Sequence, residues 1–578
     1  MAAPQPRPTP QGSFPVNGRL LRGYGPLAVF AVMLVLMALL VPTKVPDQQV
    51  SSSDGTAPSA GQGFATTPGG GASGTDSGSS GGATPVTAGG GGGGDQAAPS
   101  GGGGGGVGSD GEGSGIAPVE GVQPCPDRAE QIPGDPYSPP CVAWAGGNNG
   151  GATTKGVTED SILVSYRVLG EKGFQQTLAE LAGASLSDTP QSIQNTITAF
   201  AEYFNQRFEL YGRQIEIQFY EGQGSNTNEL LGKGRDRAEA DATKVAEEIG
   251  AFADISATSE PYAGALASRG VIGFGTPYLS REWHEQRAPF AWSLATDGTR
   301  VSELAAEYGN KRLHGKPAAY AGGDLKGQPR KFATIAPENS WYQESVNNAR
   351  RITEEAGNDP GLNVKYQLDL STMSSQANNI IPKLKNEGVT SIVCGCDPVL
   401  PVFLSGVANR EQYYPEFLIV GTALTDADIV GQLWEPQFAQ HAFGVSSLTD
   451  FVPPTQTIAY EAFKSVRPNE EPAFSVDLIY YQMYMLAIGL QGAGPNLTPQ
   501  SFSDGMFNYP ARQGPVGLWK FGPGDRTAAN DVREIYFDIN AISTYNGKQG
   551  AYLGTSGERW EAGQIPAGDP GVPPVEAR

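Results

Sequence analysis

Cysteine, histidine and basic side chains are all scarce in this chain. Its 578 residues include four cysteines and three histidines. The histidines are scattered, and no group of cysteines and histidines has the spacing of zinc ligands, so we expect neither a metal site nor a cofactor. A formal net charge of −21 argues against nucleic acid and anionic lipid as partners.

Motifs that mark common enzymes are missing as well. The sequence contains no Gly-x-Ser-x-Gly elbow and no His-Glu-x-x-His pair, and the Gly-Lys-Gly at Gly232 lacks the other residues of a phosphate-binding loop. Carboxylates are plentiful, but no pair stands out as a candidate acid and base. These absences favour a binding protein over an enzyme, with a cell-surface hydrolase as the weaker alternative.

The cysteines form two close pairs. Cys125 and Cys141 flank a proline-rich stretch, whereas Cys394 and Cys396 are separated by a single glycine. Outside the cytoplasm, the first pair is expected to close a disulfide loop ahead of the globular body. The second pair would close a very small ring. Zinc binding is the competing interpretation.

The N-terminal region predicts a membrane anchor. Residues 26–41 carry no charge, and with their flanks they approach the roughly 20 residues that span a bilayer. Arginines precede this run, which places 1–22 in the cytoplasm, a transmembrane helix at 23–45, and everything later outside the cell membrane. A cleaved signal peptide is the alternative, although no small-x-small cleavage site follows the apolar run.

A low-complexity stretch separates the anchor from the body. Residues 46–120 are mostly Gly, Ser, Ala, Thr and Pro, a composition that cannot bury enough apolar surface to offset the entropy of ordering. We expect a disordered tether, then a lead-in at 121–156 that contains the first cysteine pair. Residues 554–578 are expected to form a C-terminal tail.

Between residues 157 and 553, strand patterns alternate with helix patterns. Short runs rich in β-branched residues, such as 161–166 and 332–336, precede segments of helical period. One such helix has an apolar face made of Ile193, Ile197, Phe200, Phe204 and Phe208. The pattern predicts an α/β fold with two doubly wound parallel-sheet lobes. Lobe I is expected at about 157–300 and 443–510, and lobe II at about 315–440 and 511–545.

Several segments of this body follow one another in an order that resembles a known family. They are Tyr211–Ile215, Gly250–Ser259, Arg269–Pro277, Pro289–Asp297, Ile335–Tyr342 and Gly514–Arg526. Across residues 157–550 the chain resembles the type I periplasmic binding proteins, in particular the branched-chain amino acid (Leu/Ile/Val) receptors of ABC transporters. The resemblance implies an extracytoplasmic receptor whose lobes close around a small polar ligand, an amino acid or a derivative.

Two departures fall where that family usually grips an α-amino acid. The Ser-Gly that begins the third helix in the family is Glu-Pro-Tyr-Ala-Gly here, at Glu260–Gly264. The acid-acid-x-Tyr-Gly pattern is replaced by Glu-Asn-Ser-Trp-Tyr at Glu338–Tyr342. The resemblance therefore supports the family's fold more strongly than it supports the family's amino acid ligand.

Candidate ligand contacts lie in the loops that follow the predicted strands, because ligands bind beyond the carboxyl ends of an open parallel sheet. Short hydroxyls there suit a polar head group, and rings suit an apolar part. The candidates are Ser256, Thr258, Ser259, Thr276, Tyr278, Ser340, Trp341, Tyr342, Asp397 and Thr422.

Each type of candidate also has a structural alternative. A Ser or Thr before a helix is often an N-cap. Asp397 precedes a proline and can cap the next helix, and Trp341 can pack between helix and sheet.

The expected partners are a small-molecule ligand and an ABC permease. A membrane-held sensor that signals to a membrane partner is the alternative, favoured by an uncleaved anchor because most delivery proteins are free or lipid-tethered.

Overall fold

The computed structural model describes residues 128–170, 188–230, 232–275, 278–421, 424–450 and 452–568. The predicted cytoplasmic tail, anchor and tether lie outside these ranges, as does Cys125. Within the described ranges, no helix is both long enough and apolar enough to cross a bilayer.

Lobe I is built on a five-stranded sheet in the order β2-β1-β3-β4-β5. All neighbouring strands are parallel, which confirms the predicted sheet type and matches the 2-1-3-4-5 order of flavodoxin-like doubly wound folds. The strands are β1 (Ser161–Val168), β2 (Gln214–Glu221), β3 (Ala253–Asp254), β4 (Ile272–Phe274) and β5 (Ala291–Trp292).

Lobe II contains a seven-stranded sheet in the order β14-β13-β10-β9-β8-β6-β7. Five of these strands repeat the arrangement of lobe I and are parallel, while β13 and β14 extend the sheet in antiparallel fashion. The strands are β6 (Phe332–Pro337), β7 (Leu362–Tyr366), β8 (Ser391–Cys394), β9 (Glu416–Ile419), β10 (Ala442–Ser446), β13 (Asp531–Ile542) and β14 (Gln549–Glu561).

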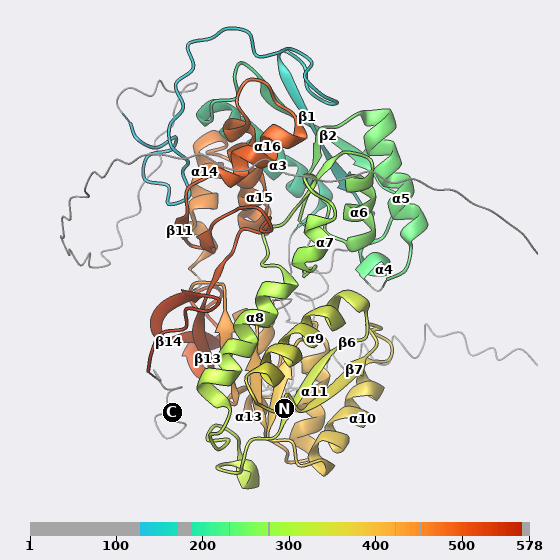
Figure 1. Cartoon of the computed structure of the whole chain (residues 1–578), viewed down its shortest axis with the longest axis vertical. Coiled ribbons are helices and arrows are strands. Elements are labelled where there is room, and N and C mark those ends of the chain that lie inside the picture. Colours follow the sequence, from blue (N-terminus) through green and yellow to red (C-terminus); the bar gives the residue numbers. More distant parts are fainter. Residues whose placement is uncertain are drawn as a thin grey trace, which may run out of the picture. The chain divides into compact units, whose positions relative to one another are not determined.

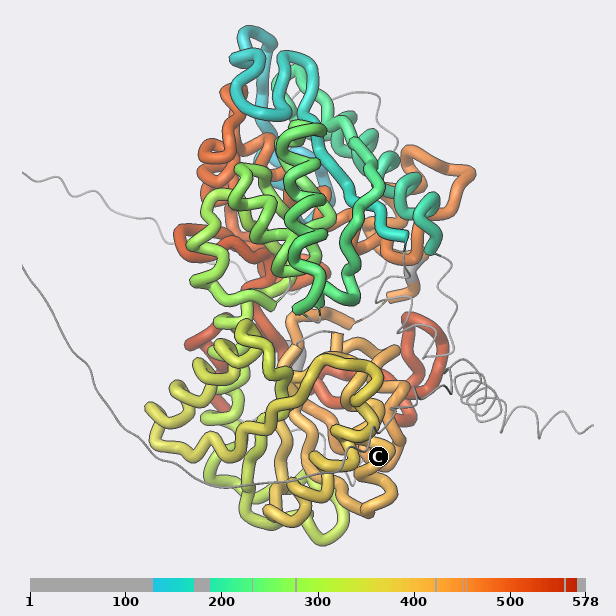
Figure 2. The backbone as a smooth tube through the Cα atoms, turned by 90° about the vertical axis from the view of Figure 1, so that its right-hand side faces the viewer, coloured from blue at the N-terminus to red at the C-terminus, as the bar shows by residue number. Residues whose placement is uncertain are grey.

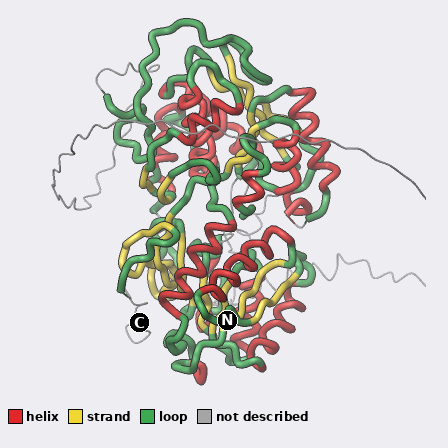
Figure 3. Tube along the Cα trace, in the orientation of Figure 1, coloured by secondary structure: helices red, strands yellow, loops and turns green. Residues whose placement is uncertain are grey.

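Helices flank the strands of both sheets (Figures 1 and 3). Those of lobe I are α3 (Pro190–Arg207), α4 (Asn226–Leu230), α5 (Arg235–Thr243), α6 (Glu260–Ser268), α7 (Arg281–Glu285), α14 (Ile458–Val466), α15 (Val476–Ala493) and α16 (Pro499–Phe507). Those of lobe II are α8 (Gly298–Tyr308), α9 (Ser340–Glu355), α10 (Met373–Asn386), α11 (Leu400–Arg410), α12 (Asp428–Gly431) and α13 (Pro436–Ala439). Short π- and 3-10-helical turns cover Lys244–Ile249, Gly309–Leu313, Gly323–Leu325 and Pro454–Gln456.

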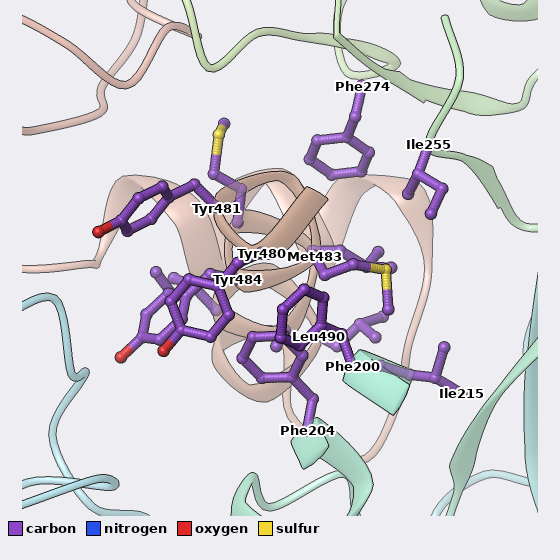
Figure 4. Packing of buried hydrophobic residues seen from close by; sticks show 14 of the residues in the cluster. Phe200, Phe204, Ile215, Ile255, Phe274, Tyr480, Tyr481, Met483, Tyr484 and Leu490 are labelled. Atoms are coloured by element: carbon purple, nitrogen blue, oxygen red, sulfur yellow. The ribbon is translucent and has the colours of Figure 1, made fainter. Parts of the chain in front are cut away.

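The core of lobe I is rich in aromatic rings. Helix α3 begins with a capping box at Thr189, and Phe200 and Phe204 on its predicted apolar face are fully buried. They pack against Tyr480 and Tyr484 of α15 (Figure 4), a helix that is buried around nearly its whole circumference. Burying each such ring contributes about 1.5–3 kcal/mol, so this contact fixes α15 on lobe I.

The lead-in is part of the same core. Tyr137 is fully buried and stacks on Trp519, with ring centroids 4.2 Å apart. Its hydroxyl donates to the carbonyl of Gly517 (2.6 Å) and accepts from the N–H of Val516 (2.9 Å). Trp519 belongs to β12 (Gly517–Trp519), which pairs with β11 (Arg512–Gly514) as a hairpin. The lead-in therefore packs into lobe I as an integral part of it.

The lobe boundaries differ from the predicted ones at several points. Strand β10 pairs with β9 and β13, so 442–446 belongs to lobe II and not to the second segment of lobe I. The hairpin 512–519 packs in the core of lobe I through Trp519. Strand β14 runs to Glu561, past the predicted end of the body. These assignments depend on long-range pairing, which local patterns do not report.

The chain crosses between the lobes at 293–297, at 447–450 with 452–457, and at 520–530. Figure 2 shows that its late segments, in orange and red, occur in both lobes. The first and last crossings lie side by side: the N–H of Ser293 donates to the carbonyl of Arg526 (3.2 Å), and Ala528 donates back to Ser293 (3.0 Å). Thr296 adds a bond to the carbonyl of Ala529 (3.0 Å). Such a small set of paired crossings is the usual construction of a hinge.

Candidate functional site

Ser256 is tied into a buried polar cluster at the end of β3. Its hydroxyl donates to Oδ1 of Asp254 (2.7 Å) and accepts from the backbone N–H of Arg167 (2.9 Å). Asp254 also accepts from Ser165 and Tyr262, and burial raises the pKa of its carboxyl. Because the Ser256 hydroxyl donates its only hydrogen bond to Asp254 within lobe I, we infer that Ser256 positions the loop after β3.

Ser259 belongs to a second buried cluster, centred on an ion pair. Glu229 accepts two hydrogen bonds from the guanidinium of Arg167, both 2.9 Å, and a third from the hydroxyl of Ser259. Arg167 also reaches Asp241 (3.3 Å) and lies over the ring of Tyr262, 3.7 Å from its centroid. Ser259 occupies the N-cap position of α6, yet its side chain caps no helix N–H. The cluster holds together the loops behind the site.

Thr258, between these two serines, is more accessible. It is half-buried, and its hydroxyl donates to Oδ1 of Asn226 at 3.3 Å. Asn226 starts α4 in the loop after β2, so it also lies beyond the end of a strand, although it was not among the predicted contacts. Thr258 and Asn226 together offer a partly exposed polar pair in lobe I.

Tyr278 and Tyr342 bring the two lobes together. Tyr278 follows β4 in lobe I, and Tyr342 lies in the first turn of α9 in lobe II. Their rings are nearly parallel, with centroids 6.3 Å apart and planes inclined by 22°, within the range of an offset stack. Burial raises the pKa of Tyr342, and the neighbouring Tyr278 and Asp397 raise it further. The pair marks the place where loops from separate lobes face each other.

Trp341 also faces lobe I. It is half-buried, and a Cβ placed on Gly232, in the loop after α4, would lie 3.8 Å from Cη2 of its ring and 3.5 Å from Nδ2 of Asn339. Trp341 thus points toward the opposite lobe and not between helix and sheet. Ser340, beside it, is exposed.

Asp397 caps a helix, as its structural alternative predicted. Its carboxylate accepts from the N–H groups of Val399 (2.7 Å) and Leu400 (3.3 Å) at the start of α11 and from the hydroxyl of Tyr366. The side chain is buried, and burial raises its pKa while these hydrogen bonds oppose the rise. Asp397 therefore organises the loop after β8 and leaves little capacity for a ligand.

The remaining candidates, Thr276 and Thr422, lie outside the described residues. The residue that sequence reasoning missed in the second of these loops is Leu424, which is 37% exposed and has φ of 61°. A positive φ on a bulky residue is an outlier, and no sequence signal other than its place after a strand could have found it.

The described part of the chain shows no group of His, Cys, Asp and Glu side chains that could hold a metal ion. Cys394 and Cys396 are joined by a disulfide at the end of β8, and both are fully buried. Cys141 is also disulfide-bonded.

Comparisons with known proteins agree with this architecture. The family model described as "Periplasmic binding protein" matches residues 178–537. An ABC transporter substrate-binding protein from Aeropyrum pernix, 13% identical, covers 70% of this chain and 96% of its own length with a TM-score of 0.50.

Two further structures match less closely in shape. A fatty acid ABC transporter substrate-binding protein from Thermomonospora curvata is 15% identical, covers 73% of this chain and 99% of its own length, and has a TM-score of 0.49. An ABC transporter substrate-binding protein from Desulfitobacterium hafniense in complex with Leu is 14% identical, covers 68% of this chain and 100% of its own length, and has a TM-score of 0.45. No curated protein matches the chain.

The family match covers more than half of the sequence and includes strands of both sheets, from β2 to most of β13. The loops that face each other lie at the strand ends where such folds bind ligands. The chain belongs to the periplasmic binding protein family.

Proposed function

We propose that this protein is an extracytoplasmic solute-binding receptor whose two lobes close around one small molecule. The observation that carries the proposal is the stack of Tyr278 on Tyr342, which joins the strand-end loops of two separate lobes. The paired crossings at Ser293 and Thr527 supply a hinge for the closure. Family membership supports the same function.

The polar network behind these loops favours binding over catalysis. Asp254, Glu229 and Asp397 all accept hydrogen bonds from protein groups, so none of them is poised as a general acid or base toward the space between the lobes. Turnover of any bound solute by the purified chain would contradict this part of the proposal.

We further propose that the receptor is held at the outer face of the cell membrane by a helix at 23–45 and delivers its ligand to an ABC-type permease. The support for the anchor is the uncharged run at 26–41 with arginines before it. A membrane-held sensor uses the same closure, and the two roles differ in whether the closed form binds a permease or a signalling protein.

A thermal-shift screen tests the receptor assignment. The full chain is mixed with amino acids, amides, short peptides, sugars, and aromatic and aliphatic acids, and unfolding is followed by tryptophan fluorescence. A true ligand at a hundred times its Kd should stabilise the folded state by about 2.7 kcal/mol. If no class of solute raises the Tm, the receptor assignment is wrong.

A further inference from the structure

The first turn of α15 lies at the edge of lobe I where the parallel strands end. Helix α15 packs beside α3 (Figure 1). The carboxylate of Asp188, just ahead of α3, accepts from the backbone N–H groups of Phe474 (2.5 Å) and Ser475 (3.2 Å). Because α3 returns the chain from the end of β1 to the start of β2, its first residues lie at the edge where such sheets bind ligands. The start of α15 therefore lies there too.

A turn of lobe II reaches the same place. Tyr545, in the turn between β13 and β14, meets Phe474 edge to face, with ring centroids 5.7 Å apart and planes inclined by 81°. The turn is fixed to α12, which follows β9, because the hydroxyl of Ser543 donates to Oδ2 of Asp428 (2.6 Å). The lobes thus meet at a second ring pair in addition to the two stacked tyrosines.

A carboxylate lies beside this second ring pair. Asp477 is half-buried in the first turn of α15. Burial raises the pKa of Tyr545, and the nearby carboxylates of Asp477 and Asp188 raise it further. Asp188 uses its two oxygens on backbone N–H groups. Among the described residues, the hydroxyl of Thr457 donates to Asp477, and no basic side chain forms a salt bridge with it.

The burial of Asp477 has no counterpart in a purely structural role. A carboxylate taken out of water without a counter-charge costs stability. An aspartate in the first turn of a helix complements the helix dipole without being buried, as the exposed Asp236 of α5 illustrates. A cation that comes from outside the chain would supply the missing partner of Asp477.

The two rings define which kind of cation fits. Phe474 is 37% exposed and Tyr545 is half-buried, so part of each ring remains accessible, and aromatic rings attract cations. A metal ion needs several oxygen, nitrogen or sulfur ligands, which one carboxylate and two rings do not supply. A primary ammonium brings three N–H donors that need acceptors, whereas a quaternary ammonium brings none and places its alkyl groups against rings.

We infer that Asp477, Phe474 and Tyr545 form a binding site for an alkylated ammonium cation. The inference rests on the proposed receptor function and names a ligand class for it. Asp477 and Phe474 belong to lobe I and Tyr545 belongs to lobe II, so the cation gains its second ring only when the lobes are closed.

Three matched probes test the inference by calorimetric titration of the full chain: choline, ethanolamine and 3,3-dimethylbutan-1-ol. Ethanolamine lacks the methyl groups of choline. The third probe has carbon in place of the quaternary nitrogen, so it keeps the shape of choline and lacks the charge. Choline should bind about tenfold or more tightly than either of the other two.

Variants then locate the binding. Asp477→Asn removes the counter-charge and should weaken choline by about tenfold or more. Phe474→Leu and Tyr545→Leu should each weaken it by about fivefold. Asp236→Asn, at the exposed first-turn aspartate, and Tyr414→Leu, at a half-buried tyrosine that precedes β9, are the matched controls and should leave Kd unchanged. The Tm of each variant shows that it is folded.

The outcomes separate the inference from the receptor assignment. If ethanolamine or the uncharged probe binds as tightly as choline, or if Asp477→Asn binds choline as the wild type does, the inference is overturned. If choline does not bind while a solute of another class does, the inference is overturned and the receptor stands. If no solute of any class binds, both fall.

Discussion

The two lobes share one strand order, yet Glu229 of lobe I and Asp397 of lobe II, two buried carboxylates that lie beyond strand ends, are stabilised in different ways. In lobe I, Glu229 and Asp241 surround the guanidinium of Arg167, and all three side chains are buried. In lobe II, Asp397 forms no salt bridge with any described residue and is held by the hydroxyl of Tyr366 and two backbone N–H groups. The comparison teaches that a buried carboxylate beyond a strand end can be stabilised by charge pairing or by neutral donors, with different consequences when a partner is lost.

Removing the cation from lobe I should have the largest effect. Arg167→Met leaves Glu229 and Asp241 buried without a counter-charge, and breaking such a cluster costs about 3–5 kcal/mol. The matched change in lobe II, Tyr366→Phe, removes one donor from Asp397 and should cost about 1–3 kcal/mol. Urea unfolding of the full chain measures both free energies, and equal losses would contradict the distinction between the lobes.

The lead-in gives lobe I a second feature that lobe II lacks. Tyr137→Phe keeps the ring on Trp519 but removes the hydroxyl that bonds to Gly517 and Val516. The unpaired backbone groups should cost about 1–3 kcal/mol in the free energy of unfolding. Tyr414→Phe in lobe II, where the half-buried hydroxyl donates to Asn409, should change stability by less. Comparable losses for the two variants would show that the lead-in is only loosely attached.

A titrating group lies where the lobes meet, at the start of α15. Burial raises the pKa of Asp477 from 3.8 to about 6, with the Thr457 hydrogen bond opposing the rise. The folded state therefore binds this proton more strongly than the unfolded state does. The resulting stabilisation is present below pH 3.8 and is lost as the pH rises through about 6.

Asp477→Asn should remove that loss and raise stability at pH 7.5 by about 1–2 kcal/mol, allowing for partial exposure of the side chain. Thermal unfolding at pH 4.5 and pH 7.5 measures the effect. Asp236→Asn is the matched control, because Asp236 also occupies the first turn of a helix but is exposed. An identical pH profile for wild type and Asp477→Asn would contradict the prediction.

The smallest expected effect concerns the strained loop of lobe II. Leu424→Gly relieves the strain of a positive φ, but it raises the entropy of the unfolded chain and removes a partly exposed side chain. The gain and the losses should nearly cancel, so the free energy of unfolding should change by less than about 1 kcal/mol. Leu370→Gly, at a leucine that is 44% exposed and has no positive φ, should be destabilising. A larger loss for Leu424→Gly would mean that Leu424 contributes to packing and not to a ligand surface.

Much of the fold was predictable from sequence because its signals are local. The apolar face of α3 and the β-branched runs of β1 and β6 identified elements and their order without any distant contact. The place of β10 in lobe II was not predictable, because it depends on pairing with β13, about ninety residues later in the chain. The same holds for the candidate site: the sequence predicted which loops follow the strands, but it did not predict the hydrogen-bond and ring partners of the side chains in those loops.

The roles of individual site residues show why. Ser259 is predicted as a ligand contact, but its hydroxyl donates a hydrogen bond to Glu229, 30 residues away. Asp397 meets Tyr366 across 31 residues, and Tyr278 meets Tyr342 between lobes. Side-chain partners of this kind arise only once the sheets are assembled, so residue type and spacing cannot report them.

The most direct test of the account is hydrogen exchange of the full chain with and without a solute that raises its Tm. If the solute is enclosed between the lobes, backbone N–H groups at Tyr278–Ser280 and at Ser340–Tyr342 should gain protection together, with the same dependence on solute concentration. Protection confined to one lobe, or none at either loop, would contradict closure of the two lobes around a ligand.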